Sequence, residues 1–372
     1  MTAVLTTSPS IAAAEAAVAQ WFGRDRAVLV GSGTAAITLL LEASELPRGA
    51  KVLYPDTICD TAVNAAVCAG LEPEFADVDP ATATLDADLP AAVDRSRIAA
   101  VMPTHIFGHL SAIPDPAEQG LSADCIVIED AAQGYGGTWQ GAKVGALAPH
   151  SIVSFGRGKL LDLGSGGALL TDDGTLGRAA EKVRASWPGP QNSSTERQAF
   201  MEACYRARKL GPAADAWVAE RDELMRRHRH GYVFQVDAEQ AARIGDAVET
   251  IDRLAERRRR LSAALQAVIL EAQERWPLSV KAFAPPETAA LWRFTFLAEP
   301  PHRKRIVESL RRAGLPVSTL FQPMHRQYLR PDAAFPQACA LADRLINIAF
   351  DGAEEVNADR LLRDCLDECF GN

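Results

Sequence analysis

The sequence predicts an α/β protein with a mostly parallel sheet in a large domain and a smaller α/β domain at its C-terminal end. Short apolar runs alternate with helical patterns from about residue 10 to 175. Continuous apolar runs are typical of strands that helices cover on both faces. The 372 residues also exceed the length at which one hydrophobic core usually stops growing. We therefore expect a large domain over 1–240, followed by a long connecting helix and a small domain over 241–372.

The strands expected in the large domain are short apolar runs: Ala27–Val30, Lys51–Tyr54, Glu74–Val78, Ile98–Pro103, Cys125–Glu129, Ser151–Phe155 and Ala168–Thr171. Between them, Ala35–Ala43 and Thr61–Ala69 are expected to be helices, because their apolar residues recur at three- and four-residue spacing. The stretch 176–230 is also helical in pattern, with a break at Pro188–Ser194 that is rich in turn-forming residues.

The second part of the chain begins with a long helix for which Asp237 is the expected N-cap. Its buried stripe is predicted to contain Ile244, Val248, Ile251 and Leu254. The elements expected after it are a strand, a helix, a second strand and two helices: Trp292–Leu297, His302–Ala313, Leu315–Phe321, Pro336–Ala349 and Asn357–Phe370.

The composition excludes several classes of protein. The net charge of -9 argues against a nucleic-acid binder, and the basic runs Arg226–His230 and Arg257–Arg260 are expected to be solvated helix faces. The seven cysteines form no CxxC pair and no cluster of zinc spacing, so neither a disulfide framework nor a metal site is expected. Reduced thiols, with no signal peptide and no run of 18 apolar residues, predict a cytoplasmic protein without membrane contact.

Four polar constellations follow predicted strands, where open α/β sheets bind their ligands. The first is Gly31-Ser32-Gly33-Thr34-Ala35, between a strand and a helix. Small residues let the backbone approach an anion, and the helix N-terminus supplies unpaired N–H groups. The motif therefore predicts a phosphate cradle, although an ordinary glycine turn with a Ser or Thr cap would look the same.

The second constellation is Glu129-Asp130-Ala131-Ala132-Gln133, directly after a buried strand. An acid at this place is costly to ionise unless it meets a positive partner, such as the ring nitrogen of a cofactor. Asp130 could also be no more than a helix N-cap.

The third constellation runs from Ser154 to Lys159 and is followed by Gly164-Ser165-Gly166-Gly167. It is not a P-loop, because Leu160 stands where a magnesium-binding Ser or Thr belongs. Ser154 can contact a phosphate while Lys159 reaches the aldehyde carbon of the same cofactor, and a lysine beside a cationic ring becomes nucleophilic. With an acid for the ring nitrogen, this set indicates pyridoxal 5'-phosphate (PLP).

The fourth constellation is Pro103-Thr104-His105-Ile106-Phe107-Gly108-His109. His105 could pack against or hydrogen-bond a ring substituent of the cofactor or substrate. A structural core histidine is an equally good interpretation of this motif alone.

In order and spacing, these motifs resemble the DegT/DnrJ/EryC1/StrS family of sugar aminotransferases, which are PLP enzymes of fold type I, the aspartate-aminotransferase fold. The resemblance extends from about Ala27 to Phe370. Besides the motifs above, it rests on Phe75-Ala76-Asp77-Val78-Asp79, Gly231-Tyr232 and Pro323-Met324-His325.

The resemblance implies a role for each matching residue. Lys159 is the Schiff-base lysine and proton shuttle, Asp130 pairs with the pyridine nitrogen, and Gln133 bonds the ring hydroxyl. The phosphate is held by Gly33, Thr34, Ala35 and Ser154. His105 and His325 are expected near the substrate. Such enzymes commonly move an amino group from glutamate to a keto-sugar and share their active sites across a homodimer.

The sequence departs from the family pattern at several positions. Cys59 stands where an aromatic residue usually stacks on the cofactor ring, so it offers less stacking area on that face. Ser165 and Val233 replace a carboxylate and an amide, and Gln198–Arg229 matches nothing in the family. These changes leave the cofactor anchor intact but bear on the substrate.

The leading hypothesis is an aminotransferase that acts on a keto-sugar, keto-cyclitol or related small ketone, in secondary-metabolite or surface-glycan synthesis. One alternative is a PLP-dependent lyase or dehydratase, although dehydrating members of the family typically carry His at the lysine position. The other is a catalytically silent paralogue that acts as a binding partner. The altered Cys59, Ser165 and Val233 favour this last reading, whereas Lys159, Asp130 and Ser154 oppose it.

Overall fold

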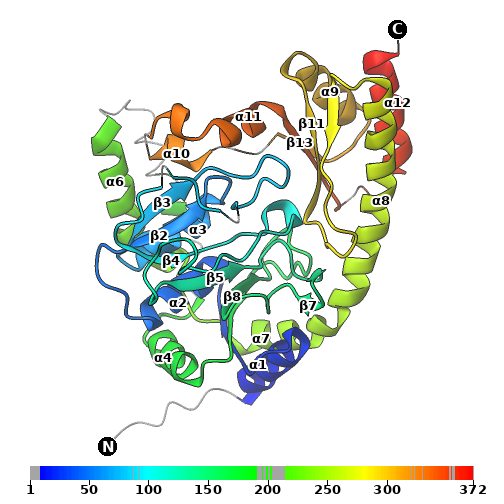
Figure 1. Ribbon diagram of the computed structural model, residues 1–372. Helices are drawn as coiled ribbons and strands as arrows, with labels where there is room; N and C mark the ends of the chain where they lie inside the picture. The colour runs from blue at the N-terminus through cyan, green and yellow to red at the C-terminus, as the bar shows by residue number, and fades with distance from the viewer. Residues whose placement is uncertain are drawn as a thin grey trace, which may run out of the picture.

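The computed structural model describes residues 9–371, except for 87, 92, 191–194, 196–197, 200–201, 203–213, 320, 322, 329, 352 and 354–356. It has a large sheet and a small sheet, and one long helix runs along the side of the molecule between them (Figure 1). Part of the predicted segment Gln198–Arg229, residues 200–201 and 203–213, lies outside the described residues. Its last part forms α6 (Ala214–Arg227).

The large sheet has seven strands in the order β1-β9-β8-β5-β4-β2-β3. The strand β9 runs antiparallel to both its neighbours, and all the others are mutually parallel. In sequence order their bounds are Arg26–Val30 (β1), Lys51–Pro55 (β2), Glu72–Ala76 (β3), Ile98–Val101 (β4), Ile126–Asp130 (β5), His150–Ser154 (β8) and Gly167–Thr171 (β9). The prediction of a mostly parallel sheet is confirmed, and each predicted strand is present within a few residues.

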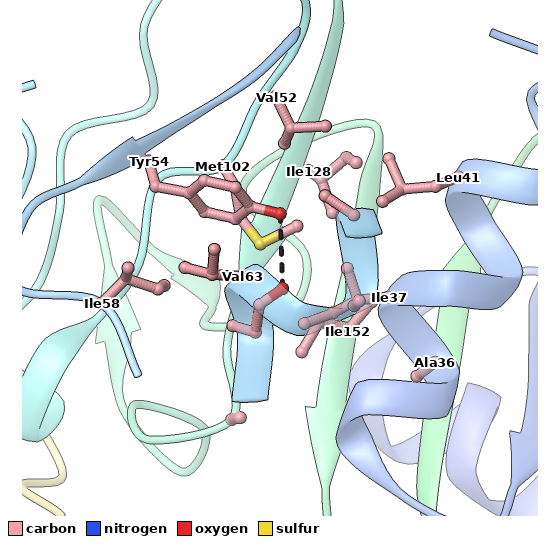
Figure 2. Close-up of a cluster of buried hydrophobic side chains, with 14 of the residues drawn as sticks. Ala36, Ile37, Leu41, Val52, Tyr54, Ile58, Val63, Met102, Ile128 and Ile152 are labelled. Carbon is pink, nitrogen blue, oxygen red and sulfur yellow. Dashed lines mark hydrogen bonds between the residues drawn. The ribbon is translucent and has the colours of Figure 1, made fainter. Parts of the chain in front are cut away.

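Alternate residues of these strands pack on opposite faces of the sheet. Val28 and Val30 face α2 (Gly33–Ala43) and α3 (Asp60–Cys68), which cover one side. On this side, Tyr54 lies among aliphatic side chains and its hydroxyl donates to the carbonyl oxygen of Ala62 at 3.3 Å (Figure 2). Leu29 faces the other side, where α1 (Pro9–Phe22) packs. Burial on both faces explains why the strands are continuous apolar runs.

The remaining elements of the first part are α4 (Gly174–Ala185) and a short hairpin of β6 (Thr138–Trp139) and β7 (Ala142–Lys143). Asp173 caps the start of α4, and its side chain accepts hydrogen bonds from the backbone nitrogens of Thr175 and Leu176. It packs against α2 on the same side of the sheet, as Figure 1 shows.

The predicted long helix after Asp237 is two helices. Asp237 caps α7 (Ala238–Ala247) by accepting from the backbone nitrogen of Gln240 at 2.7 Å, as predicted. The chain then tightens into a 3₁₀ turn over Val248–Thr250, where the Thr250 hydroxyl bonds the carbonyl oxygen of Ala247. It continues as α8 (Ile251–Arg275), which rises to the second sheet (Figure 1). The apolar stripe across the joint is buried, so the spacing alone could not reveal the break.

The second sheet is antiparallel, in the order β10-β11-β13-β12. Its strands are Val280–Ala282 (β10), Arg293–Ala298 (β11), Val317–Ser318 (β12) and Leu345–Ala349 (β13). The helices α9 (Pro300–Arg312) and α12 (Ala358–Phe370) pack beside one another and, with α8, bury the apolar side of this sheet. Part of the predicted strand Leu315–Phe321 forms β12.

One predicted element of this region is wrong. The segment Pro336–Ala349 is not a single helix: α11 (Pro336–Arg344) ends at Arg344, and Leu345–Ala349 is an inner strand. The strand pairs with β11 on one side and β12 on the other. Its backbone hydrogen bonds therefore depend on residues far away in the sequence, and these override the local helical pattern. The short helix α10 (Met324–Gln327) lies before α11.

In the described part of the chain, no helix is both long and apolar enough to cross a membrane.

Candidate active site

The predicted site residues converge on one edge of the large sheet. Because β1, β2, β4, β5 and β8 are parallel, the segments that follow them meet at the same edge. These segments carry the Gly31–Ala35 turn, Cys59, His105, Asp130 and the loop that contains Lys159.

The turn at the start of α2 has the features of an anion cradle. A methyl group on Gly33 would lie 2.8 Å from Cβ and 3.0 Å from Oγ of Ser154, so the helix start and Ser154 are in close approach. Ser32 caps the helix by accepting from the backbone nitrogen of Ala35 at 3.0 Å. The amides of Gly33 and Thr34 have no partner inside the helix and remain for a ligand. The N–H of Ala35 already donates to Ser32, so Ala35 forms part of the turn but has no free donor for a phosphate.

Asp130 and Lys159 form the charged centre of the site. Asp130 ends β5, is 6% exposed, and its Oδ1 accepts from the backbone nitrogen of Ala132 at 3.0 Å. Burial raises the pKa of Asp130 against the attraction of Lys159. Lys159 lies half-buried in the loop after β8, where burial lowers the pKa of its amine although Asp130 opposes the shift. A lysine with a lowered pKa holds more of the neutral, nucleophilic amine.

Gln133 is held with its amide nitrogen available. Its Oε1 accepts from the backbone nitrogen of Phe107 at 2.8 Å, which leaves the NH₂ group as a donor. Phe107 has a φ of 56°, a left-handed conformation that is uncommon for a bulky residue. The hydrogen bond to Gln133 and a second one, from the nitrogen of Trp292 to the carbonyl of Phe107 at 2.8 Å, hold it there.

A cleft of about 250 Å³ opens beside these residues. The large-sheet part of the chain lines it with Thr57, Ile58, Cys59, Asp60, Ile106, Phe107 and Gln133. The later part lines it with Trp292, Arg293, Phe321, Met324, Gln327 and Asn347. Both sheets therefore contribute walls.

The aromatic surface of the cleft comes from Phe107, which the fourth constellation includes without a role, and from Trp292, which no motif includes. The rings of Phe107 and Trp292 stack with an interplanar angle of 7° and centroids 6.3 Å apart. The Nζ of Lys159 lies 5.1 Å from the centroid of the Trp292 indole. Cys59 is exposed, with its Sγ 3.1 Å from the hydroxyl of Thr61. No local motif marks Trp292, which the sequence analysis places only as the first residue of a predicted strand.

His105 is wholly buried at the edge of the site. Its Nδ1 accepts from the backbone nitrogen of Ser111 at 2.9 Å, so its Nε2 carries the proton and donates to Glu129 at 3.1 Å. Burial alone would raise the pKa of Glu129, but the hydrogen bonds from His105, Gly145 and Leu147 lower it overall. Both ring nitrogens are thus engaged within the fold. A direct contact of His105 with substrate stays a prediction and would require one of these bonds to break.

His325 has the same kind of environment. Asp56 accepts from its Nδ1 and from its backbone nitrogen, each at 2.6 Å, and its Nε2 lies 2.9 Å from Asp332. The imidazole also stacks on Phe335 with centroids 4.3 Å apart. The structure places this ring wholly buried between two carboxylates. Its predicted contact with substrate is likewise untested, and Asp56 is a partner that the sequence analysis missed.

One departure from the family pattern has a structural counterpart. Val233, in the position of the usual amide, is completely buried in the core of its own chain. The neighbouring carbonyl of Tyr232 accepts from the Ser32 hydroxyl at 2.7 Å. This segment therefore supports the phosphate turn through its backbone.

Comparison with known proteins places the chain in a family. The model of the DegT/DnrJ/EryC1/StrS aminotransferase family matches residues 2–351. The chain belongs to this family. The predicted resemblance is confirmed, and with it the expectation of a PLP-dependent aminotransferase of fold type I.

Over the stretches that align, relatives with curated names are about 30% identical to the chain. The L-glutamine:2-deoxy-scyllo-inosose aminotransferase of Streptomyces kanamyceticus is 28% identical over 315 residues, which are 82% of this chain and 68% of that protein. The GDP-perosamine synthase of Caulobacter vibrioides is 31% identical over 176 residues, 47% of each chain. The matched stretches thus span about half to two thirds of these relatives.

Solved structures support the fold. The crystal structure of 3-amino-5-hydroxybenzoic acid synthase superimposes with a TM-score of 0.72 at 22% identity, covering 97% of this chain and 91% of that one. The GDP-4-keto-6-deoxy-D-mannose-3-dehydratase of E. coli gives a TM-score of 0.69 at 18% identity, covering 97% and 92%. At such low identity the likeness speaks for the fold alone.

Proposed function

We propose that this enzyme transfers the amino group of an amino acid, glutamine or glutamate, to the carbonyl carbon of a keto-cyclitol or keto-sugar. The observation that carries the proposal is the convergence of Lys159, buried Asp130 and the Gly33–Ser154 cradle beside a cleft that both sheets line. The names of relatives that aminate scyllo-inosose derivatives and form GDP-perosamine support this class of acceptor.

The residues present fit PLP. The close approach of Gly33 to Ser154 leaves two helix amides and a hydroxyl for the phosphate. Asp130 offers a carboxylate to the ring nitrogen, and the NH₂ group of Gln133, oriented by Phe107, offers a donor to the ring hydroxyl. Lys159 supplies the amine that carries the cofactor. When bound, PLP supplies the electron sink that lets a proton leave the carbon next to nitrogen.

The chain's own groups then perform three tasks. Asp130, which is buried at the end of β5, would hold positive charge at the ring nitrogen. The Nζ of Lys159, with its lowered pKa, takes and returns a proton at the substrate carbon. The stacked Phe107 and Trp292 exclude water from one wall of the cleft.

A homodimer with shared active sites and a cytoplasmic location complete the proposal. The resemblance to the family supports the dimer, and cysteines that are free among the described residues support a reducing compartment. Light scattering of the purified protein at two concentrations tests the dimer directly.

The proposed reaction is tested by two half-reactions. Enzyme loaded with PLP is mixed with L-glutamine or L-glutamate, and conversion to the pyridoxamine form is followed by absorbance. The aminated enzyme is then offered keto-cyclitols and keto-sugar nucleotides. We expect the amino donor to convert the enzyme to its pyridoxamine form in the first step. In the second step, one of these ketones should return the enzyme to its PLP form.

The two alternatives give other outcomes. A dehydratase would release water from a keto-sugar without net transfer of nitrogen from the donor. A silent paralogue would show no spectral change with any donor, even with saturating PLP. Either result would overturn the aminotransferase assignment.

A further inference from the structure

The second sheet presents a polar face to the cleft. Along β11 and β13 the apolar residues Phe294, Phe296, Ile346 and Ile348 enter the core that the helices cover. The residues between them point the other way. Asn347 lies opposite Thr295 on β11 and opposite Ser318 on β12, and Arg293 is two residues before Thr295. Arg293 and Asn347 both line the cleft.

Asn347 has an unused donor. Its side chain is wholly buried, and its Oδ1 accepts from Nη1 of Arg293 at 3.1 Å and from the hydroxyl of Ser318 at 2.8 Å. Because a guanidinium only donates, the oxygen must face Arg293, and this fixes the orientation of the amide. Its Nδ2 has no hydrogen-bond partner among the described residues. A buried N–H without an acceptor costs free energy. A bound ligand with an oxygen near Nδ2 would accept its hydrogen bond and remove this cost.

Arg293 supplies a positive charge next to this donor. No ion pair within 4.0 Å joins its guanidinium to a carboxylate of the described residues. Burial lowers its pKa and the attraction of Asp351 opposes that shift, while the guanidinium keeps its charge. Its Cζ lies 4.5 Å from the centroid of the Trp292 indole, and the Nζ of Lys159 lies 5.1 Å from the same centroid. The Cζ of Arg293 and the Nζ of Lys159 are therefore at most about 10 Å apart.

We propose that Arg293 and Asn347 bind the α-carboxylate of the amino donor. This inference rests on the proposed aminotransferase function. It assigns to Arg293 and Asn347 the recognition of one group of the donor substrate. A carboxylate has two oxygens, which match one N–H of the guanidinium and the free N–H of the amide. An amino acid carries its carboxylate one carbon away from the atom that reacts with the cofactor, which suits the short span between Arg293 and Lys159. Asp60 also lines the cleft and would repel an anion bound beside it, so Arg293 is the favoured place for a carboxylate.

The test compares each amino donor with its descarboxy analogue: L-glutamate with 4-aminobutyrate, and L-glutamine with 4-aminobutanamide. Single-turnover conversion of PLP-loaded enzyme gives a rate constant for each, and their ratio measures recognition of the carboxylate. The variants are Arg293→Gln and Asn347→Asp. Asn347→Asp keeps an oxygen for Arg293 and Ser318 but sets a negative charge against the substrate. Arg260→Gln, on an exposed part of α8, is the matched control.

We expect the preference for the amino acid to fall about 100-fold in Arg293→Gln and in Asn347→Asp, and to stay at the wild-type value in Arg260→Gln. A binding measurement gives a second readout. Calorimetric titration of the PLP-loaded protein with glutarate, an unreactive dicarboxylate, should show affinity in the wild type and at least tenfold weaker binding in both variants. Circular dichroism and PLP content establish that the variants are folded.

The outcomes separate this inference from the proposed function. An unchanged preference in both variants, with wild-type glutarate affinity, overturns the carboxylate site but leaves the aminotransferase intact. A loss confined to the return half-reaction with the ketone also overturns it, because the anion would then belong to the acceptor. If no donor converts wild-type enzyme, the proposed function fails, and the glutarate titration still decides whether Arg293 and Asn347 bind a carboxylate.

Discussion

The indole nitrogen of Trp292 donates a hydrogen bond to the carbonyl oxygen of Gly158, the residue that precedes Lys159. The same tryptophan donates its backbone N–H to Phe107 and stacks on the Phe107 ring. One residue at the entrance to β11 thus connects the second sheet, the loop that orients Gln133 and the loop that carries the lysine. The position of Lys159 therefore depends on contacts between the two parts of the chain.

Trp292→Phe tests this connection. The ring stack can persist, but the hydrogen bond to Gly158 is lost, so the lysine loop is held less firmly. We expect kcat to fall about tenfold and the free energy of unfolding to fall by about 1 kcal/mol, while PLP still binds. Trp276→Phe, which alters a tryptophan stacked on Phe370 far from the cleft, is the control. Equal kcat values in the two variants would show that Trp292 does not position the lysine.

Gly33→Ala tests the phosphate cradle. The added methyl group would lie within 3.0 Å of two atoms of Ser154 and must push the helix start away from the hydroxyl. We expect the affinity for PLP to fall at least tenfold, measured by equilibrium dialysis of the apoenzyme. Gly189→Ala is the control, because a methyl group there meets nothing within 4 Å. Wild-type affinity in Gly33→Ala would place the phosphate elsewhere.

The variant Asp130→Asn distinguishes binding of the cofactor from the protonation of its ring nitrogen. The amide can still bond a ring nitrogen but cannot hold a positive charge there, so proton transfer by Lys159 loses its driving force. We expect PLP to remain covalently bound and the rate of transamination to fall more than about 100-fold. Asp124→Asn, at an exposed position before β5, should behave as wild type. Full turnover by Asp130→Asn would mean that another acid serves the ring.

Much of this arrangement is readable from the sequence, because it depends on local order. Apolar runs followed by glycine, serine or acidic residues gave the large sheet and the edge at which Asp130, Ser154 and Lys159 meet. The strand Leu345–Ala349 was mistaken for helix because its identity depends on pairing with β11, which lies far away in the sequence. Spacing likewise could not show that Asp56 and Asp332 bracket His325, or that Trp292 reaches Phe107.

The stability of the protein should depend on His109. This buried ring bonds Thr295 of the second sheet, and burial lowers its pKa to about 4. In the unfolded chain, the His109 ring takes up a proton near pH 6.5, whereas in the folded chain it stays neutral down to about pH 4. The contribution of neutral His109 to the free energy of unfolding is therefore complete above pH 6.5 and is lost as the pH falls from about 6.5 to 4. The loss from this one group amounts to roughly 3 kcal/mol at the lower limit.

Urea unfolding of the apoenzyme between pH 7.5 and 4.5 measures this decline. His109→Gln should remove it, so the difference in unfolding free energy between wild type and variant should shrink as the pH falls. His302→Gln, on α9, should follow the wild-type curve. Parallel curves for wild type and His109→Gln would contradict the assignment.

The central claim is that Lys159 carries the cofactor, and the most direct measurement is the site of the covalent bond. Wild-type enzyme saturated with PLP is reduced with borohydride, digested and mapped by mass spectrometry. We expect a single pyridoxyl-phosphate adduct on Lys159, and none in Lys159→Ala treated in the same way. An adduct on any other lysine, or a wild-type protein without one, would contradict the account.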